Sequence, residues 1–459
     1  MSIESPTLKS ISAGQNSFNI DPVEVTYKEI EEETKDDLFR HLRGFLIFGK
    51  LIGLLPYKGI FGHSSSNLKF RYVSLPSFIS YGILVILFIN SFFEFLRSVT
   101  ASKKNAFEVA QSIRFIFYQV WGAVIYLNFL LRSKSFLGIF QAWKSTTVFY
   151  SKPDGKLRRD IRLIAIVILL SAILENAVLH ILFTVEYANG TNSGKGKKHA
   201  NKTFGEAYYT GFHKSWANCI SYHPVVATIA FIQHKCTMLA WNYIDILIAV
   251  LGRALYYKFK IISELAKESL VSRKKSLFSE SGGKNEPLDK QGWLQMTKDH
   301  HSVCELLNAF ENFLSPLLFI SYMVNIYYVC MQLVEGLTVE TKKHSLFLTI
   351  YAPWSFMHLI MRLYILSLSC AKINHYAHEI RDVIQLCPES YYTTNVSRLD
   401  KRVTGGRDIG LSGLGCFTVT KPFILTVIGV VFTFEIVLLQ VYPNPDHTNN
   451  CSPAPAPSG

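Results

Sequence analysis

The chain has 459 residues, of which 49% are hydrophobic and 14% aromatic, and its formal net charge is +13. A mean hydropathy of +0.20 is too high for an ordinary soluble protein and indicates a chain that crosses a membrane several times. The excess of Lys and Arg does not indicate a nucleic-acid partner, because these residues lie in short segments between apolar runs, where they orient helices in a bilayer.

The N-terminal part changes character near residue 37. Residues 1–36 are polar and lack the apolar core of a cleavable signal peptide, so we expect a disordered or loosely amphipathic arm. Residues 37–61 are basic and amphipathic, and their apolar side chains recur at helical spacing: Leu42, Phe45, Phe48, Leu51 and Leu55. Such a helix fits two positions equally well, flat on the inner membrane surface or packed beneath the first membrane span.

Seven apolar stretches follow, each about long enough to cross a bilayer as an α-helix. They cover residues 76–96, 110–131, 161–184, 223–252, 313–334, 346–370 and 422–441. Apolar, helix-forming sequence continues after the fourth stretch and precedes the fifth. This predicts long helices that project into the cytosol and are joined by a polar, flexible tip over residues 276–290.

The basic residues favour one orientation of these helices. Lys and Arg number 31 in residues 37–75 and in the segments that lead into the third, fifth and seventh spans, with Arg162 included. They number 11 in the segments on the other side, with Arg114 included. Because cytosolic loops carry the excess of positive charge, the N-terminus is predicted to be cytosolic and the C-terminus extracellular. This is the reverse of a G-protein-coupled receptor.

Two glycosylation sequons agree with this orientation. Asn189 and Asn201 each begin an Asn-X-Thr sequon between the third and fourth spans, a segment that we expect outside the cell. Asn395 begins another sequon in a segment expected inside, which we interpret as a chance match. Cys219 and Cys451 are both expected outside the membrane, and the sequence leaves open whether they form a disulfide.

The last apolar stretch has one distinctive face. When it is wound as a helix, Thr433, Val437, Gln440 and Val441 fall on the same side. A helix turned wholly to lipid does not need Thr and Gln, whereas a helix that lines a narrow aqueous path does. The same pattern also fits a helix packed in a bundle, with Gln440 bonded to a neighbour or to interfacial water.

This C-terminal region resembles a known family. The segment GLSGLGCFTVTK followed by TFEIVLLQ resembles the signature of insect gustatory receptors, and most closely their sugar-receptor branch. Thr433 is followed by Phe434, where the family usually has Tyr, and Gln440 by Val441, where the family usually has Phe. The Trp241-Asn-Tyr-Ile-Asp245 segment and the inverted seven-span layout extend the resemblance over the chain.

The resemblance implies an all-α membrane protein of the plasma membrane that acts as a sugar-gated, non-selective cation channel in chemosensory neurons. Such a channel is a homotetramer, or a heteromer with related receptors, in contact with membrane lipid. Monovalent and divalent cations pass along a pore lined by the last helix. Carried over to this sequence, the gate residues are Val437 and Val441, with the Gln440 amide beside them and Thr433 on the same face. The alternative is a seven-span chemoreceptor of the G-protein-coupled type, without a pore of its own, which the predicted orientation disfavours.

The chain is then expected to divide into seven parts. These are a cytosolic arm and amphipathic helix (1–72), a ligand-binding bundle of four membrane helices (73–252), cytosolic helical extensions with a loop (253–312), two further membrane helices (313–370), a cytosolic anchor segment (371–421), the pore helix (422–441) and an extracellular tail (442–459).

Polar and aromatic side chains within the spans are candidates for a ligand site, because a sugar needs amides or carboxylates for its hydroxyls and an aromatic ring for its C–H face. The candidates are Glu175, Asn176, His180, Trp241, Asp245, Tyr322, Asn325, Trp354 and His358. The alternative is that they form hydrogen bonds that hold the bundle together. Two basic residues also lie within spans: we expect Arg362 to reach toward the cytosolic surface, and Lys235 to find an acidic partner on the third or fifth span.

The sequence contains no cluster of His and Cys at metal-ligand spacing, no Gly-rich phosphate loop and no acid–base motif of the kind that a membrane hydrolase needs. We therefore expect no enzymatic activity, no cofactor and no metal site.

Overall fold

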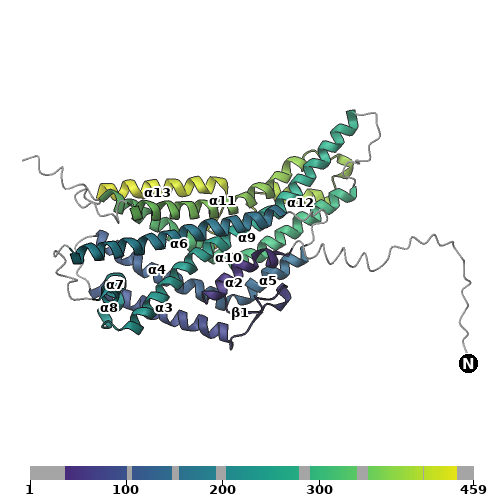
Figure 1. Ribbon diagram of the computed structural model, residues 1–459. Helices are drawn as coiled ribbons and strands as arrows, with labels where there is room; N and C mark the ends of the chain where they lie inside the picture. The colour runs from purple at the N-terminus through teal and green to yellow at the C-terminus, as the bar shows by residue number, and fades with distance from the viewer. Residues whose placement is uncertain are drawn as a thin grey trace, which may run out of the picture. The chain divides into compact units, whose positions relative to one another are not determined.

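The computed structural model describes residues 37–100, 106–146, 155–192, 203–278, 290–338, 350–406 and 408–441, which are helical almost throughout (Figure 1). The predicted N-terminal arm lies outside these residues. Seven helices contain the described parts of the seven expected spans: α3 (Leu75–Thr100), α4 (Ala106–Leu131), α6 (Gly155–Asn192), α9 (Pro224–Phe278), α10 (Lys290–Thr338), α11 (Ala352–Ile384) and α13 (Lys421–Val441). Six of them are long and apolar enough to cross a membrane. The seventh, α13, has 21 residues.

Two of these helices are far longer than a membrane requires. Helix α9 has 55 residues and α10 has 49, as the continued helical pattern around residues 253–312 predicts. Both run on past the apolar bundle, and α11 accompanies α9 along much of its length. A short helix, α12 (Thr394–Thr404), packs against α10 and α11. It inserts its buried side chains Val396, Leu399 and Val403.

Several shorter elements were not expected from the sequence. Helix α5 (Ser133–Ser145) packs on α10, while α7 (Phe204–Phe212) and α8 (Lys214–Cys219) lie between α6 and α9 in the chain. Two small antiparallel hairpins pair β1 (Tyr57–Lys58) with β2 (Lys69–Phe70), and β3 (Ser412–Gly413) with β4 (Phe417–Thr418). Two short 3-10 turns, Ser65–Asn67 and Glu389–Tyr391, complete the described elements.

The amphipathic N-terminal segment forms α2 (Leu38–Leu51), which packs against α5, α6 and α9. Its Phe45 ring stacks on Tyr243 of α9, with centroids 4.1 Å apart. Of the two positions open to this helix, the structure therefore has it packed beneath the bundle. Leu51, the last residue of α2, is 74% exposed and is not part of the face that packs on these helices.

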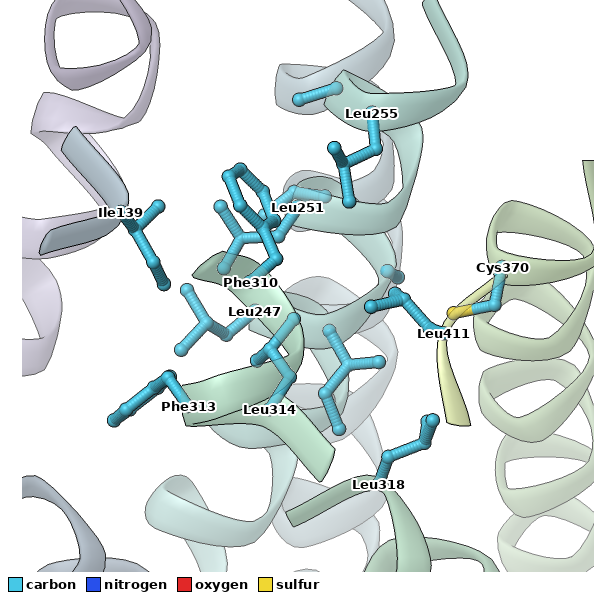
Figure 2. Packing of buried hydrophobic residues seen from close by; sticks show 14 of the residues in the cluster. Ile139, Leu247, Leu251, Leu255, Phe310, Phe313, Leu314, Leu318, Cys370 and Leu411 are labelled. Carbon is cyan, nitrogen blue, oxygen red and sulfur yellow. The ribbon is translucent and has the colours of Figure 1, made fainter. Parts of the chain in front are cut away.

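The centre of the bundle is α9. All residues from Tyr243 to Val250 are fully buried, so this helix is apolar around its whole circumference except at Asp245. Figure 2 shows the inner packing, in which Leu247, Leu251 and Leu255 of α9 lie four residues apart and belong to one cluster with residues of α5, α10 and α11. Leu411, on the segment that leads into β3, is fully buried in the same cluster.

The β3–β4 hairpin fastens the chain to α10 before α13 begins. The backbone N–H groups of Ser412 and Leu414 donate hydrogen bonds to Glu311 Oε1 (2.9 Å) and Ser315 Oγ (2.8 Å). The Phe417 ring of β4 then stacks on Phe423 of α13, with centroids 4.5 Å apart. The same two rings meet the edge of Tyr322 on α10, at 5.5 and 5.3 Å. The first turn of α13 is thus held by aromatic contacts to α10.

The packing of α2 against α9 can be tested by substituting two glycines of α2. A Cβ atom at Gly49 would lie 2.6 Å from the ring of Tyr243, which is fully buried and stacked on Phe45, so the ring has little room to move. We expect Gly49→Ala to lower the free energy of unfolding by about 1–3 kcal/mol, the usual cost of overpacking.

Gly44→Ala is the matched control, because a Cβ atom there meets nothing within 4 Å. Alanine favours a helix over glycine, so this variant should be as stable as the parent or slightly more stable. The measurement is thermal unfolding of the purified protein in detergent. Equal midpoints for the two variants would contradict the described packing of α2.

Candidate functional site

An ion pair lies in the middle of the helix bundle. Asp245 on α9 and Arg362 on α11 are both buried, and Arg362 Nε lies 2.8 Å from Asp245 Oδ2, although the two groups are not aligned as a hydrogen bond. The pair joins two helices inside the apolar region, where an unpaired charge would be very costly. The expectation that Arg362 reaches toward the membrane surface is therefore wrong.

Amide and hydroxyl groups complete the shell around this pair. Ser321 and Asn325 of α10 donate hydrogen bonds to Asp245 Oδ1 (2.5 Å) and Oδ2 (3.2 Å). The guanidinium of Arg362 donates to Asn325 Oδ1 (2.7 Å) and to Asn242 Oδ1 (2.9 Å). Both charges thus have several partners, and α9, α10 and α11 are fixed relative to one another.

An aromatic group covers one side of the guanidinium. The Arg362 carbon Cζ lies 4.5 Å from the centroid of the Trp241 ring, a favourable cation–π arrangement. Trp241 in turn packs against Tyr328 of α10 at 4.8 Å and Tyr118 of α4 at 5.9 Å. Its indole Nε1 is buried and has no hydrogen-bond partner in the described part of the chain.

A second set of bonds ties α6 to this region. The imidazole of His358 on α11 is 2.8 Å from Ser171 Oγ on α6 and 3.1 Å from Asn242 Oδ1. Ser355 donates to Glu175 Oε1 (2.5 Å), and the other carboxylate oxygen lies 3.8 Å from His358. Four helices therefore meet in one continuous polar network, which we call the central network: Ser171, Glu175, Trp241, Asn242, Asp245, Ser321, Asn325, Ser355, His358 and Arg362.

The central network brings together five of the nine candidate ligand residues, namely Glu175, Trp241, Asp245, Asn325 and His358. The other four lie elsewhere. Tyr322 bonds to Ser367 (2.7 Å) and packs at the base of α13, and Trp354 is 39% exposed on the N-terminal turn of α11. Asn176 and His180 belong to a separate group around Lys235. Sequence analysis missed Asn242 and Ser321 as partners of the ion pair, although a charged residue inside a span signals that such partners exist.

Lys235 on α9 is the centre of this second group. Its ammonium donates to Asn176 Oδ1 (2.9 Å) and lies 2.6 Å from His180 Nε2, both on α6. Its partners on the third span are thus an amide and an imidazole, so the expectation of an acidic partner is wrong. Tyr208 of α7 reaches the other imidazole nitrogen of His180 at 3.4 Å.

A chain of side-chain amides joins other helices in the same half of the bundle. Asn90 of α3 donates to Gln233 of α9 (2.8 Å), whose own amide donates to Gln119 of α4 (2.7 Å). Ser215 of α8 donates to Asn90 (3.2 Å). These buried groups satisfy one another, which indicates a structural role in holding α3, α4, α8 and α9 together.

Helix α13 has three different faces. The first, with Phe423, Ile424, Val427 and Val431, packs on α10 and α11. The second is apolar and exposed and includes Ile428 and Phe432. The third is the one predicted from the sequence: Thr433, Val437 and Gln440 are exposed, and Thr433 Oγ1 donates to Gly429 O (2.9 Å) within the helix. Val441 ends the helix, and its side chain lies outside the described part of the structure, as does that of Glu435.

The two predicted glycosylation sites are only partly described. The backbone of Asn189 belongs to α6, which continues to Asn192, while Asn201 lies outside the described residues. Cys219, at the end of α8, is an exposed free cysteine, and Cys451 lies outside the described residues.

Comparison with known proteins identifies the family. A family model described as the trehalose receptor matches residues 23–451. The chain belongs to the trehalose receptor family. It is 24% identical over 452 residues to the gustatory receptor for sugar taste 64a of Drosophila melanogaster, covering 95% of this chain and 91% of that protein. It is also 24% identical over 343 residues to the gustatory receptor 5a for trehalose of the same organism, covering 72% and 71%. The predicted resemblance to the sugar branch of insect gustatory receptors is confirmed.

Solved structures show the same fold. The insect olfactory receptor OR5 from Machilis hrabei superposes with a TM-score of 0.57 at 14% identity, over 92% of this chain and all of that one. The same receptor in complex with eugenol gives 0.55 at 15% identity, over 88% of this chain. This trehalose receptor family member is thus an all-α, multi-pass protein of the plasma membrane with the fold of an insect chemoreceptor.

The central ion pair gives a stability prediction for this family member. Arg362→Met leaves the Asp245 carboxylate buried without its counter-charge, which should lower the free energy of unfolding by about 3–5 kcal/mol. The double variant Asp245→Asn with Arg362→Met removes both charges and should lose much less. Thermal unfolding in detergent, together with surface expression, measures the difference. A single variant as stable as the double variant would contradict the described pairing.

A pH dependence follows from His213, which lies between α7 and α8, outside the spans. Burial, and then the nearby Lys235 and His180, lower the pKa of His213 from 6.5 to about 4. Between pH 6.5 and pH 4, His213 is protonated in the unfolded chain but neutral in the folded chain. The free energy of unfolding therefore decreases as the pH falls through this range. Between pH 7.5 and pH 5 this residue should cost about 2 kcal/mol. In His213→Gln the unfolding midpoint should fall less between pH 7.5 and pH 5 than it does in the parent. An equal fall in both proteins would show that His213 is not buried in the folded chain.

Proposed function

We propose that this receptor is a sugar-gated, non-selective cation channel in which the α13 helices of several copies, four by the family resemblance, surround the ion path. The observation that carries the proposal is the third face of α13. Val437 and Gln440 are exposed there, although the sequence of this helix is apolar enough to lie in a bilayer. Lipid is a suitable cover for the apolar face with Ile428 and Phe432. It is a poor cover for an amide, which favours water or another polar surface.

The gate in this proposal is apolar. Rings of Val437 and Val441 side chains from several copies narrow the path to a few ångströms, and so narrow an apolar ring loses its water and blocks ions. When the helices rotate or move apart, the Gln440 amides take the place of the valines and partly solvate a passing cation. A ring of neutral amides discriminates weakly among cations. The proposed channel is therefore non-selective.

The ligand in this proposal is a sugar, as the similarity to the Drosophila receptors for sugar taste and for trehalose supports. Polar and aromatic groups lie along this part of α9. Lys235 contacts His180, and the ring of His234, the residue before Lys235, lies 5.6 Å from that of Tyr118, which lies 5.9 Å from Trp241. Sugars bind where amides and imidazoles alternate with rings. The indole N–H of Trp241 has no acceptor among the described residues, so it is available to a sugar hydroxyl.

The candidate ligand residues then divide by role. We propose that Asn176, His180, Trp241 and Trp354, with Glu175 and His358 behind them, contact or orient the sugar. Both oxygens of Asp245 are occupied by protein partners, and Asn325 is bonded to both members of the ion pair. We therefore assign Asp245, Asn325 and Tyr322 to the transmission of the signal toward α13.

The proposal includes an orientation in the membrane. The N-terminus lies in the cytosol and the end of α13 outside, as the distribution of basic residues supports. The long ends of α9, α10 and α11, with α12, then form a cytosolic anchor domain, and Asn189 and Asn201 lie on the extracellular side as glycosylation sites.

The direct test is electrical recording from cells that express this chain alone, during application of a panel of mono- and disaccharides. The proposal predicts a cation current evoked by at least one sugar and absent from untransfected cells. A sugar response that requires a co-expressed G protein and is carried by another channel would instead support a receptor without its own pore.

A substitution on α13 tests the pore assignment. Gln440→Ala removes the amide from the third face and should change single-channel conductance or cation preference, while the sugar concentration for half-maximal current stays within about threefold. The control is Phe432→Ala. Phe432 is 66% exposed and lies one residue before Thr433, about 100° round the helix, so its change should leave conductance unaltered. If Gln440→Ala altered only the choice of sugar, the third face would not line the pore.

A further inference from the structure

Lys235 has no counter-ion among the described residues. Its ammonium group is half-buried on α9, and its hydrogen-bond partners are Asn176 Oδ1 and His180 Nε2. The Phe231 ring lies 5.1 Å from it. No Asp or Glu oxygen of the described chain comes within 4.0 Å of this nitrogen, in contrast to Arg362, which has Asp245.

The surroundings of Lys235 are basic or neutral. Three imidazoles lie near it: His180 contacts the ammonium directly, His234 precedes Lys235 in α9, and the His213 ring lies 5.9 Å from that of His234. Glu175, the acidic residue nearest to Asn176 in sequence, bonds Ser355 and faces His358 in the central network. No carboxylate is therefore directed at the Lys235 group by the helices that pack around it in the described structure.

A buried imidazole nitrogen lies in the same region. His213 is 6% exposed, and its Nε2 atom is buried with no hydrogen-bond partner among the residues that the structure describes. Its ring lies 5.9 Å from that of His234, the residue before Lys235. An unpartnered imidazole nitrogen beside an uncompensated ammonium is the arrangement that a bound anion would satisfy.

Aromatic rings form the adjoining wall. Tyr208 stacks on Phe212 with centroids 4.7 Å apart, and Phe183 meets Phe212 at the same distance. The hydroxyl of Tyr208 reaches His180 at 3.4 Å. Rings of this kind offer a surface to the C–H face of a sugar while the ammonium holds a charged substituent at one end.

An amide and an imidazole satisfy hydrogen bonds of the ammonium but leave its charge uncompensated in a region of low dielectric. We propose that Lys235 is the anion-binding end of the ligand site, and that this receptor responds to sugars that carry a carboxylate, such as uronic or aldonic acids. This rests on the proposed function, since it names the ligand class of the same site. Lys235 binds the carboxylate, His213 and Tyr208 lie beside it, and the neutral part of the sugar extends along the rings toward Trp241.

The test compares D-glucuronate with D-glucose at neutral pH in cells that express the chain. The parent should respond to glucuronate at a concentration about tenfold or more below that needed for glucose. Lys235→Gln should remove this preference: the glucuronate concentration needed should rise about tenfold or more relative to the glucose concentration needed. Lys235→Arg keeps the charge and should keep the preference for glucuronate.

A second readout does not depend on a current. Glucuronate should raise the unfolding midpoint of the purified parent protein in detergent, and should not raise that of Lys235→Gln. Thermal stabilisation by glucuronate without any sugar-evoked current would keep the ligand assignment and reject the channel. Sugar-evoked currents that Lys235→Gln weakens equally for glucose and glucuronate would show that Lys235 only links α6 to α9, and would overturn the inference.

Discussion

The structure depends on one buried charge and the groups that satisfy it. Within a bilayer core a polar group has no water to bond, so every donor and acceptor needs a partner inside the protein. Arg362 meets this requirement with Asp245, Asn242 and Asn325, and with the ring of Trp241 over one face. Such a set of bonds is made only at one relative position of α9, α10 and α11, so the pair fixes where these three helices stand.

Of the seven helices that contain the described parts of the expected spans, α13 has the fewest attachments to the rest of the described structure. It is held at its first turn by Phe417 and Tyr322, and along one face by α10 and α11. Tyr322 directly follows Ser321, which donates to Asp245. A ligand that disturbs the central network therefore acts one residue away from the contact that holds the base of the proposed pore helix. The proposed sugar-binding bundle and a last helix with few attachments are the two parts that a ligand-gated channel requires.

The parts of the fold that could be predicted are those that depend on the sequence of a single segment. Long apolar runs predicted the seven helices that contain the described parts of the expected spans, and the face of α13 with Thr433 and Gln440 followed from the 3.6-residue period. The short helix α5 was missed because Lys134 and Lys144 interrupt its apolar pattern. Helix α7 was missed within a polar segment, although Thr203 and Glu206 have the spacing of a helix start, and Thr203 Oγ1 indeed accepts from the Glu206 N–H. The partners of Arg362 could not be predicted, because they lie on other helices far away in the sequence and no local pattern identifies them.

The central claim is that the face of α13 with Thr433, Val437 and Gln440 looks onto an ion path between copies of this chain. Imaging of the purified protein in lipid nanodiscs tests it most directly. The account predicts several copies around an axis, with α13 innermost and Gln440 directed at a central opening. A monomer, or an assembly in which that face of α13 is covered by lipid, would contradict it.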